Sequence, residues 1–497
     1  MHSIFSYYIS KDEVNIAELD TKRVLGDYLV YTDSDTPFNS FVKGERGCAL
    51  FGYAIDVISG DCDDLTNKIL LQTGNLAEVI EYESRLGGKY ILLYFDGSGF
   101  YVIGDATCSI PVYFGGLAEG FACSCNPNYI ARELSLEPDE KLMKIRNLSE
   151  ISQALPYNVT VYKEIKQLIP NHYLSFSKRA DSRFVNSSSK QREIGVEEAT
   201  KTVAPMIDNL VKYYLNEFDT YCPITSGRDS RVVLAFLAAY ANDELKGYTI
   251  KHKEHSGAEQ DLVIPRLLAE HCSFSYEQIA DVDPLDKLVF AVNRILGKGQ
   301  YSSKTLLIAN TVKAYCKGRA IINGDIIGQV GKCSLHRDIP EFLATPRYFR
   351  CKMHNYSKES LLYVKKWLKD IKQSGEKVNT FDLFSVENRL GRWAGQENLI
   401  YNTISQPYLN VFNSRSIIYT WTAVPRNKRK KSLLHFGLIE VKQPKMMEIP
   451  FEKEKKTVFK LSKANGIFYY LSSFAKFYIE KMKFLRNKNE KSDSNCG

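Results

Sequence analysis

The spacing of apolar residues changes once along the chain, near residue 195. Before that point the apolar residues gather in short runs, such as 47–57 and 89–106, and Asp96-Gly97 divides the second run into two halves. An Asp-Gly pair between two apolar runs is typical of a β-hairpin. The first third of the chain is therefore predicted to consist of short antiparallel strands joined by turns.

After residue 195, short apolar runs alternate with longer segments that have helical spacing. Strands are predicted over 221–224, 245–250 and 273–278, and helices over 197–214, from Arg231 onward and over 258–271. Strands that alternate with helices are typical of a parallel, doubly wound sheet, which binds its ligand at the carboxyl ends of the strands. The second half of the chain is predicted to have this architecture.

The first of these strands leads into a polar turn, Thr225–Ser230, which contains hydroxyl groups and a glycine. The first N–H groups of a helix have no partner within the helix, so a helix that begins directly after such a turn is suited to bind phosphate. Asp229 could hold a magnesium ion that accompanies the phosphate. The alternative is an ordinary polar turn between a strand and a helix.

The turn resembles the pyrophosphate loop, Ser-Gly-Gly-x-Asp-Ser, of the N-type ATP pyrophosphatases, and in particular that of the synthetase domain of asparagine synthases. Thr225 stands at the first position of the loop, and Asp229 and Ser230 match its last two. The resemblance implies that ATP and Mg²⁺ bind here. The residues that it places around the pyrophosphate are Thr225, Ser226, Gly227, Arg228, Asp229 and Ser230.

A second segment with this resemblance follows the next predicted strand. Residues 257–264 resemble the start of a helix that lies near the adenosine in the family, and Asp261 is the matching acid. An acid in the first turn of a helix is also stabilised by the helix dipole, without any ligand. Both interpretations of Asp261 remain open.

A third segment, residues 320–331, stands where the family has a strand followed by S-G-[DE]-G-x-D-E. Gly324 and Asp325 match, but Gly328-Gln329 replaces the Asp-Glu pair. In relatives the lost Asp is the second magnesium ligand. Either Asp325 takes over this role through a shifted loop, beside Asp229, or the site binds nucleotide without turning it over.

The N-terminal region resembles the glutaminase domain of asparagine synthases, through residues 86–105 and 111–114. That glutaminase is an N-terminal nucleophile hydrolase, and it needs a cysteine at position 2 that is freed by removal of the initiator methionine. This chain has His2 there. An imidazole cannot form the thioester intermediate, so the glutaminase is predicted to be inactive.

Residues 387–393 and 411–425 resemble the helices that close the synthetase domain over its substrate. Arg389 and Arg392, three apart on one predicted helix, could clamp a carboxylate or a phosphate, and an exposed salt-bridging face is the alternative. Relatives also use a lysine near the end of the domain. Lys453 is the candidate here, although neighbouring lysines at 455 and 456 fit as well.

The resemblance covers the chain to about residue 455 and implies a mixed fold of the α/β and α+β classes. A glutaminase-like β-sandwich of the Ntn hydrolase type is expected over 1–177, and a polar linker over 178–195. A doubly wound, parallel-sheet ATP pyrophosphatase domain of the adenine nucleotide α-hydrolase-like type is expected over 196–456. Residues 457–497 are expected to form a basic aromatic helix and, from 486, a disordered tail.

Composition narrows the class of protein further. The chain has 497 residues, with a net charge of +8 that is too small to indicate nucleic-acid binding. Its 11 cysteines show no zinc or disulfide spacing, and no secretory signal is evident, so a cytoplasmic protein is expected.

The segment 467–485 combines aromatic residues with lysines. It either covers the side of a domain or makes weak peripheral contact with an anionic membrane surface, which would be the inner one.

Two hypotheses for function follow. In the first, the chain is a ligase that adenylates a small-molecule or glycan-linked carboxylate with ATP and transfers it to an amine or to ammonia. Relatives with a Gly-Arg-Asp-Ser loop occur among proteins tied to surface-polysaccharide assembly. In the second, the chain is a catalytically silent nucleotide-binding or scaffold protein, which His2 and Gly328-Gln329 favour.

Overall fold

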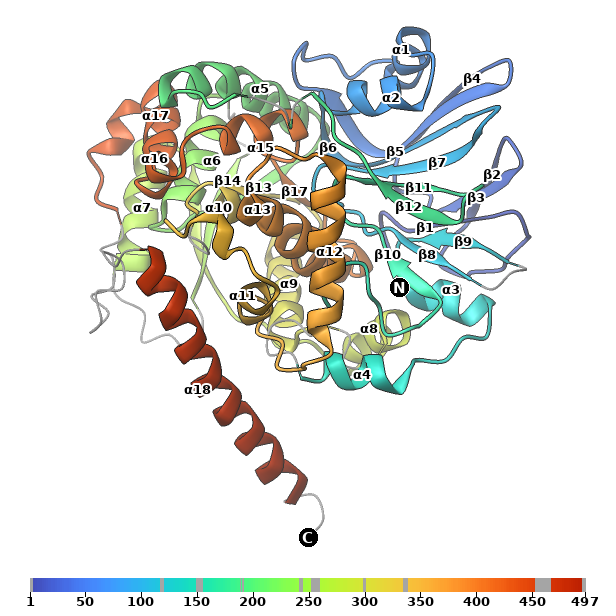
Figure 1. Ribbon diagram of the computed structural model, residues 1–497. Helices are drawn as coiled ribbons and strands as arrows, with labels where there is room; N and C mark the ends of the chain where they lie inside the picture. Colours follow the sequence, from blue (N-terminus) through green and yellow to red (C-terminus); the bar gives the residue numbers. More distant parts are fainter. Residues whose placement is uncertain are drawn as a thin grey trace.

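The computed structural model describes residues 3–116, 120–148, 155–187, 189, 192–240, 245–251, 260–297, 301–333, 338–451 and 466–493, without the side chains of residues 260, 261, 393, 396 and 487–493. The chain forms an N-terminal part built on two antiparallel sheets and a second part built on one parallel sheet (Figure 1). This architecture confirms the predicted fold class.

The N-terminal part is a sandwich of two six-stranded sheets, with strand orders β10-β8-β9-β1-β3-β2 and β12-β11-β7-β6-β5-β4. The strands of the first sheet are β1 (Tyr7–Ser10), β2 (Thr21–Leu25), β3 (Tyr28–Thr32), β8 (Tyr113–Gly115), β9 (Ala122–Ser124) and β10 (Ile165–Gln167). Those of the second are β4 (Phe38–Lys43), β5 (Arg46–Asp56), β6 (Leu86–Asp96), β7 (Gly99–Gly104), β11 (His172–Ser175) and β12 (Ala180–Arg183). Helices α1 (Leu65–Gln72) and α2 (Leu76–Glu83) pack on the second sheet, and α3 (Pro127–Glu133) on the first. Helix α4 (Glu140–Arg146) follows α3 in the chain.

Strand β6 is apolar on both faces because both of its faces are covered. Ile91 and Leu93 point into the core between the two sheets, whereas Tyr90, Leu92 and Tyr94 lie in the core that includes residues of α1 and α2. Successive side chains of a strand point to opposite faces, so a central strand of a covered sheet has a continuous apolar run. The predicted hairpin is confirmed, since β6 and β7 pair across the Asp96-Gly97 turn.

The second part contains a five-stranded parallel sheet with the order β15-β14-β13-β16-β17. Its strands are β13 (Thr220–Pro223), β14 (Lys246–Lys251), β15 (Ser275–Ala280), β16 (Ala320–Asn323) and β17 (Tyr408–Asn410). Helices α5 (Val196–Glu217), α6 (Arg228–Ala238), α15 (Arg415–Thr422) and α17 (Leu433–Lys442) pack around one core, and α8 (Asp286–Leu296), α9 (Ser303–Cys316) and α14 (Gly395–Thr403) pack around another. The other elements are α7 (Gln260–Cys272), α10 (Asp325–Val330), α11 (Pro346–Lys352), α12 (Ser360–Ser374), α13 (Thr380–Leu383), α16 (Arg426–Lys430), the π-helix η3 (Phe384–Ala394), and the 3₁₀ helices η2 (Glu341–Leu343) and η4 (Pro444–Met447).

The strand order places two of the predicted ligand loops side by side. From β13 the chain moves outward through β14 and β15 and then returns to add β16 on the other flank of β13. The turn after β13 (224–227) and the turn after β16 (residue 324) therefore lie next to each other, at the carboxyl ends of adjacent strands. Such a topological switch point is where open α/β sheets bind their ligands.

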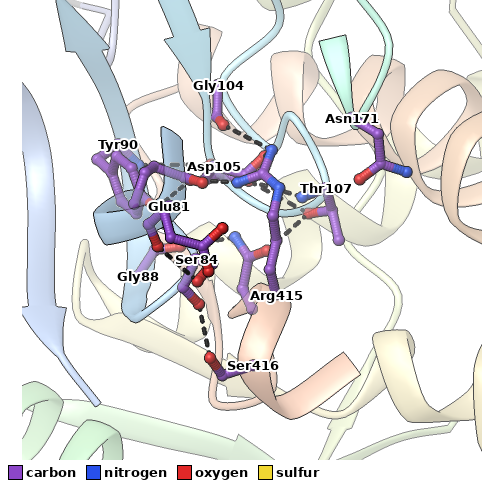
Figure 2. A network of polar contacts seen from close by, with 12 residues as sticks. Glu81, Ser84, Gly88, Tyr90, Gly104, Asp105, Thr107, Asn171, Arg415 and Ser416 are labelled. Atoms are coloured by element: carbon purple, nitrogen blue, oxygen red, sulfur yellow. Dashed lines mark hydrogen bonds and ion pairs between the residues drawn. The ribbon is translucent and has the colours of Figure 1, made fainter. Parts of the chain in front are cut away.

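The two parts are joined by backbone and side-chain contacts between β6 and the segment that leads into α15. The Gly88 N–H donates to Asn413 O at 3.0 Å, and Asn413 Nδ2 donates to Gly88 O at 2.6 Å. Ser416 N–H donates to Ser84 O at 3.1 Å, and Figure 2 shows these two serines together. Gly88 has φ +137°, and a Cβ there would lie 2.1 Å from Tyr53 O, so only glycine fits at this junction.

The segment predicted to be a linker contributes a strand, which corrects that prediction. Residues 180–183 form β12, at the edge of the second sheet, paired with β11. Arg183 on this strand is buried, and it makes a bidentate ion pair with Glu387, with N···O distances of 2.6 and 2.7 Å. The strand is polar because it is half-buried at the edge of the sheet and because Arg183 pairs with a buried acid. It therefore lacks the alternation of apolar and polar residues from which a strand is predicted.

The C-terminal helix α18 (Gly466–Asp493) packs one of its sides against α11 and extends away from the body of the molecule (Figure 1). Phe477 is buried beside Tyr356, and Tyr470 stacks on Tyr348 at 5.1 Å between ring centroids. The tail expected to be disordered from 486 is helical as far as Asp493, because lysine, arginine and glutamate continue the helix. No helix in the described ranges is long and apolar enough to cross a membrane.

The other side of α18 presents apolar residues to solvent, with Phe468, Leu471 and Met482 each more than half exposed. If this side binds an anionic membrane surface, the double variant Leu471→Glu, Met482→Glu should bind vesicles containing phosphatidylserine at least about tenfold more weakly, because each change replaces apolar burial by charge repulsion. Vesicle co-sedimentation measures this. Leu362→Glu, at an exposed leucine on α12, is the matched control, and equal binding by all three proteins would contradict the prediction.

Candidate functional site

The turn after β13 is held in shape by its own hydroxyl groups. Thr225 Oγ1 lies 2.6 Å from Ser230 Oγ and accepts a hydrogen bond from Gly227 N–H at 3.2 Å. Helix α6 begins at Arg228, and no side chain among the described residues caps its first turn. The free N–H groups of a helix start, together with the helix dipole, favour a bound anion.

Asp229, in the first turn of α6, contacts two basic side chains that lie far away in the sequence. Lys332 Nζ donates to Asp229 Oδ2 at 2.7 Å, and His435 Nε2 lies 3.0 Å from Asp229 Oδ1. Burial tends to raise the pKa of Asp229, but the hydrogen bond from His435 and the positive charge of Lys332 outweigh it and hold the pKa below its usual range. Asp229 is therefore a carboxylate at neutral pH.

The imidazole of His435 is fully buried against Trp421, with 5.2 Å between ring centroids. Burial lowers its pKa more than the contact with Asp229 raises it. A neutral imidazole has one N–H, and the contact with the carboxylate assigns this proton to Nε2. His435 thus donates a hydrogen bond to Asp229 and fixes its orientation.

The residues around Asp229 do not fit the predicted magnesium site. Magnesium prefers six oxygen ligands, and both oxygens of Asp229 already accept hydrogen bonds from nitrogen donors. A Cβ added at Gly328 would lie 3.4 Å from Asp229 Oδ2, so this is where a second carboxylate would stand, and the glycine provides none. Within the described residues, no group of three or more His, Cys, Asp or Glu side chains could hold a metal ion.

Asp325, the other predicted metal ligand, begins α10 on the neighbouring loop. Its Oδ2 accepts a hydrogen bond from Tyr408 Oη at 2.7 Å, and its N–H donates to Asn323 Oδ1 at 3.0 Å. Desolvation within the surrounding pocket raises the pKa of Asp325 despite the contact with Tyr408, and the charge of Asp229 adds to the rise.

A pocket of about 70 Å³ lies beside Asp325, between the two parts of the chain. Lys89 from β6 enters it, and its ammonium group donates to Asn402 Oδ1 at 2.8 Å. Burial lowers the pKa of Lys89 to about 7. Glu397 of α14 also lines the pocket, and burial raises its pKa to about 7. The pocket is thus lined by one acid and one base whose pKa values both lie near neutrality.

Arg392 has a role different from the predicted substrate clamp. Its guanidinium group is fully buried and donates to the carbonyl oxygens of Leu155 and Val159 and to Gln167 Oε1. These contacts join η3 to the segment that precedes β10. Burial lowers its pKa to about 10. The prediction assumed an α-helix, in which residues three apart share a face, whereas η3 is a π-helix with a wider turn.

Arg389 lies in the same π-helix and is partly buried. Burial lowers its pKa, and the negative charge of Glu397 partly opposes this shift. Its position near Glu397 keeps it among the candidate residues, although it does not form a pair with Arg392. Lys453 lies outside the described residues. Asp261 lies in α7, and its side chain is likewise not described.

The remaining predicted residues lie in or next to the turns that follow β13 and β16. Ser226 is a buried residue of the turn, and a Cβ added at Gly324 would lie 3.1 Å from Asp229 O. Arg228 Nη1 donates to Ser432 Oγ at 3.0 Å, and its guanidinium group lies over the Phe436 ring.

The N-terminal residues described, from Ser3 onward, are buried at the junction of the two parts. Ile4 N–H donates to Asn402 O at 3.0 Å, and the Lys89 ammonium lies over the Phe5 ring at 4.6 Å from its centroid. His2 lies outside the described residues. Position 2 therefore precedes a buried segment that contacts α14.

We expect the purified protein not to hydrolyse glutamine, since His2 replaces the thiol nucleophile. Glutamate release from glutamine, with and without ATP, measures this. Turnover well above a blank without enzyme would contradict the prediction.

Four functional candidates were missed from the sequence: Lys89, Lys332, Glu397 and His435. No local motif marks Lys332, Glu397 or His435, because each is a single charged or polar residue in an otherwise ordinary helix or turn, whereas Lys89 lies in the segment 86–105 that resembles the glutaminase domain. Lys89 was the one with a signal, since a lysine inside a continuous apolar run that becomes a buried strand needs a partner. For the others, only the fold shows the partner.

No protein-family model matches the sequence, and no curated protein matches it. Among solved structures, the chain is similar to NMN synthetase from Francisella tularensis, at 13% identity and a TM-score of 0.22 over 40% of this chain and 93% of that chain. It is also similar to glutamine-dependent NAD⁺ synthetase from Acinetobacter baumannii, solved with ADP (9% identity, TM-score 0.21, 50% of this chain and 66% of that one). A third similar structure is glutamine phosphoribosylpyrophosphate amidotransferase from B. subtilis, solved with ADP and GMP. The identity is 11% and the TM-score 0.21, over 62% of this chain and 63% of that chain. Similarities this low do not assign a function to this chain.

Proposed function

We propose that the chain is an ATP-dependent ligase that activates a carboxylate by adenylation and joins it to an amine or ammonia, without a working glutaminase. The observation that carries the proposal is the meeting of two features at one edge of the parallel sheet. One is the uncapped start of α6 beside Thr225–Ser230, and the other is the pocket that holds Asp325, Glu397 and Lys89.

The two features are suited to different steps of the proposed reaction. The start of α6, with the hydroxyl groups of Thr225 and Ser230, is suited to hold the phosphates of ATP and to stabilise the pyrophosphate leaving group. Glu397, whose pKa is raised to about 7, is suited to remove a proton from the attacking amine. The pocket is small, so it fits the reacting carboxylate and amine rather than a whole polymer, and a glycan-linked substrate would place only its terminal group there.

Exchange of radiolabelled pyrophosphate into ATP tests the proposal, since adenylation is reversible. A panel of free and glycan-linked carboxylates should contain at least one that raises exchange far above the rate without carboxylate. Glu397→Gln should leave this exchange largely intact and lower amide formation, because the proton is removed only in the second half-reaction. If no carboxylate supports exchange while ATP still binds, the chain is the silent nucleotide-binding protein of the competing hypothesis.

A further inference from the structure

The charged groups next to the start of α6 have an unusual composition for a phosphate site. Asp229, in the first turn of α6, contacts the ammonium group of Lys332 and the buried His435, and the guanidinium group of Arg228 lies near His435. Lys332 is about one-quarter exposed, so its ammonium group can reach a second partner as well as Asp229.

The position of Lys332 matches the absence of a side chain at Gly328. Gly328 lies in α10, and a Cβ there would contact the same oxygen of Asp229, Oδ2, that accepts from Lys332. Lys332 follows four residues later, directly after the end of this helix. The ammonium group of Lys332 and a side chain at position 328 would therefore both lie beside the same oxygen of Asp229.

The electrostatic consequence can be compared with that of a metal ion. Two carboxylates around one Mg²⁺ have no net charge, and neither do one carboxylate and one ammonium group. In both cases a cation stands next to the helix start, where it can meet the negative charge of a phosphate. An ammonium group holds a phosphate as a point charge with up to three hydrogen bonds, without needing octahedral oxygen ligands.

We propose that Lys332 takes the place of a magnesium ion, so that a pyrophosphate group binds at the start of α6 without a metal. The inference rests on the proposed function, because it concerns the same phosphate site. It implies that Asp229 orients Lys332 rather than a metal ion, with His435 holding the other carboxylate oxygen.

Calorimetric titration with inorganic pyrophosphate tests the proposal, first with a chelator and then with excess magnesium. We expect the affinity of the full chain to differ by less than about threefold between the two conditions. Lys332→Met should weaken metal-free binding at least about tenfold, since a charge-assisted contact is lost, and Lys332→Arg should retain most of it. Lys442→Met is the matched control, because Lys442 also forms a partly buried ion pair, with Asp208, on the far end of α17.

A second variant tests the converse, that a magnesium ion takes the place of Lys332 once a second carboxylate is present. Gly328→Asp combined with Lys332→Ala rebuilds a pair of carboxylates, and it should bind pyrophosphate at least about tenfold more tightly with magnesium than without. Wild-type binding that requires magnesium would overturn the inference and leave the proposed function standing. Absence of pyrophosphate and ATP binding in both conditions would overturn both. A Lys332→Met protein that is folded, as shown by an unchanged thermal transition, and binds as tightly as the wild type would also overturn the inference.

Discussion

Arg415→Met should destabilise the protein by about 3–5 kcal/mol, because it leaves a buried carboxylate without its partner. Arg415 and Glu83 form an ion pair at the junction of the two parts, and both side chains are almost completely buried. Arg415 Nη2 also donates to Gly104 O at 3.1 Å (Figure 2). Burial already raises the pKa of Glu83 against the effect of Arg415, so among the described residues the hydrogen bond from Tyr90 Oη, at 2.7 Å, is what remains when the arginine is removed.

Urea unfolding followed by fluorescence and by circular dichroism measures the loss. Because the pair joins two parts of the chain, the two signals should also separate in the variant if one part unfolds first. Adding Glu83→Gln to Arg415→Met should recover part of the stability, since it removes the unpaired charge. Lys201→Met, which breaks the exposed pair with Glu197, should change the midpoint little. A loss for Arg415→Met no larger than that of Lys201→Met would contradict the prediction.

Elements with a strong local signal were predictable from the sequence. The β6–β7 hairpin followed from Asp96-Gly97, and the strand–turn–helix around Thr225–Ser230 followed from an apolar run that stops at a polar turn. Even there the helix begins at Arg228, three residues before the predicted start. The residues from Arg228 to Ser230 are polar, and each makes polar contacts with residues of the turn or of neighbouring segments, so apolar spacing could not include them.

The partners of the site residues were not predictable, because the sequence separates them widely. Asp229 meets Lys332 and His435 only through the order of the strands, which places α10 beside α6 and packs α17 onto α6. A spacing rule for helices could not foresee that η3 is a π-helix, which turns Arg392 toward buried carbonyl groups. Likewise β12 is defined by its pairing with β11 rather than by its own polar sequence.

The pocket is lined by residues from both parts of the chain. The proposed chemistry therefore depends on the junction between these parts. Lys89 reaches the pocket from β6, and Glu397 reaches it from α14. Any change that loosens the contact of Gly88 with Asn413 would separate the acid from the base. His2 replaces the glutaminase nucleophile, but we interpret the N-terminal sandwich as part of the lining of this pocket, to which it contributes Lys89.

Glu397→Gln should stabilise the protein at pH 8 by about 2 kcal/mol relative to the wild type and should have little effect near pH 4.5. The pKa of Glu397 is raised from 4.5 to about 7, first by burial and then by the charge of Asp325, against the hydrogen bond from Thr305 at 3.0 Å. The folded state therefore binds more protons than the unfolded state between these two values. Wild-type stability contributed by the neutral acid is complete below pH 4.5 and is lost as the pH rises through 7.

A pKa shift of this size corresponds to roughly 3 kcal/mol, and partial solvent access to Glu397 reduces the expected effect to about 2 kcal/mol. The lowered pKa of Lys89 acts mainly above pH 7 and in both proteins, so it cancels in the difference. Thermal or urea unfolding of wild type and variant at several pH values between 4.5 and 8 gives the curve. Glu448→Gln, at an exposed acid after η4, controls for the same chemical change. A constant difference between Glu397→Gln and wild type across this range would show that the acid in the pocket titrates as an ordinary glutamate and could not serve as the base near neutrality.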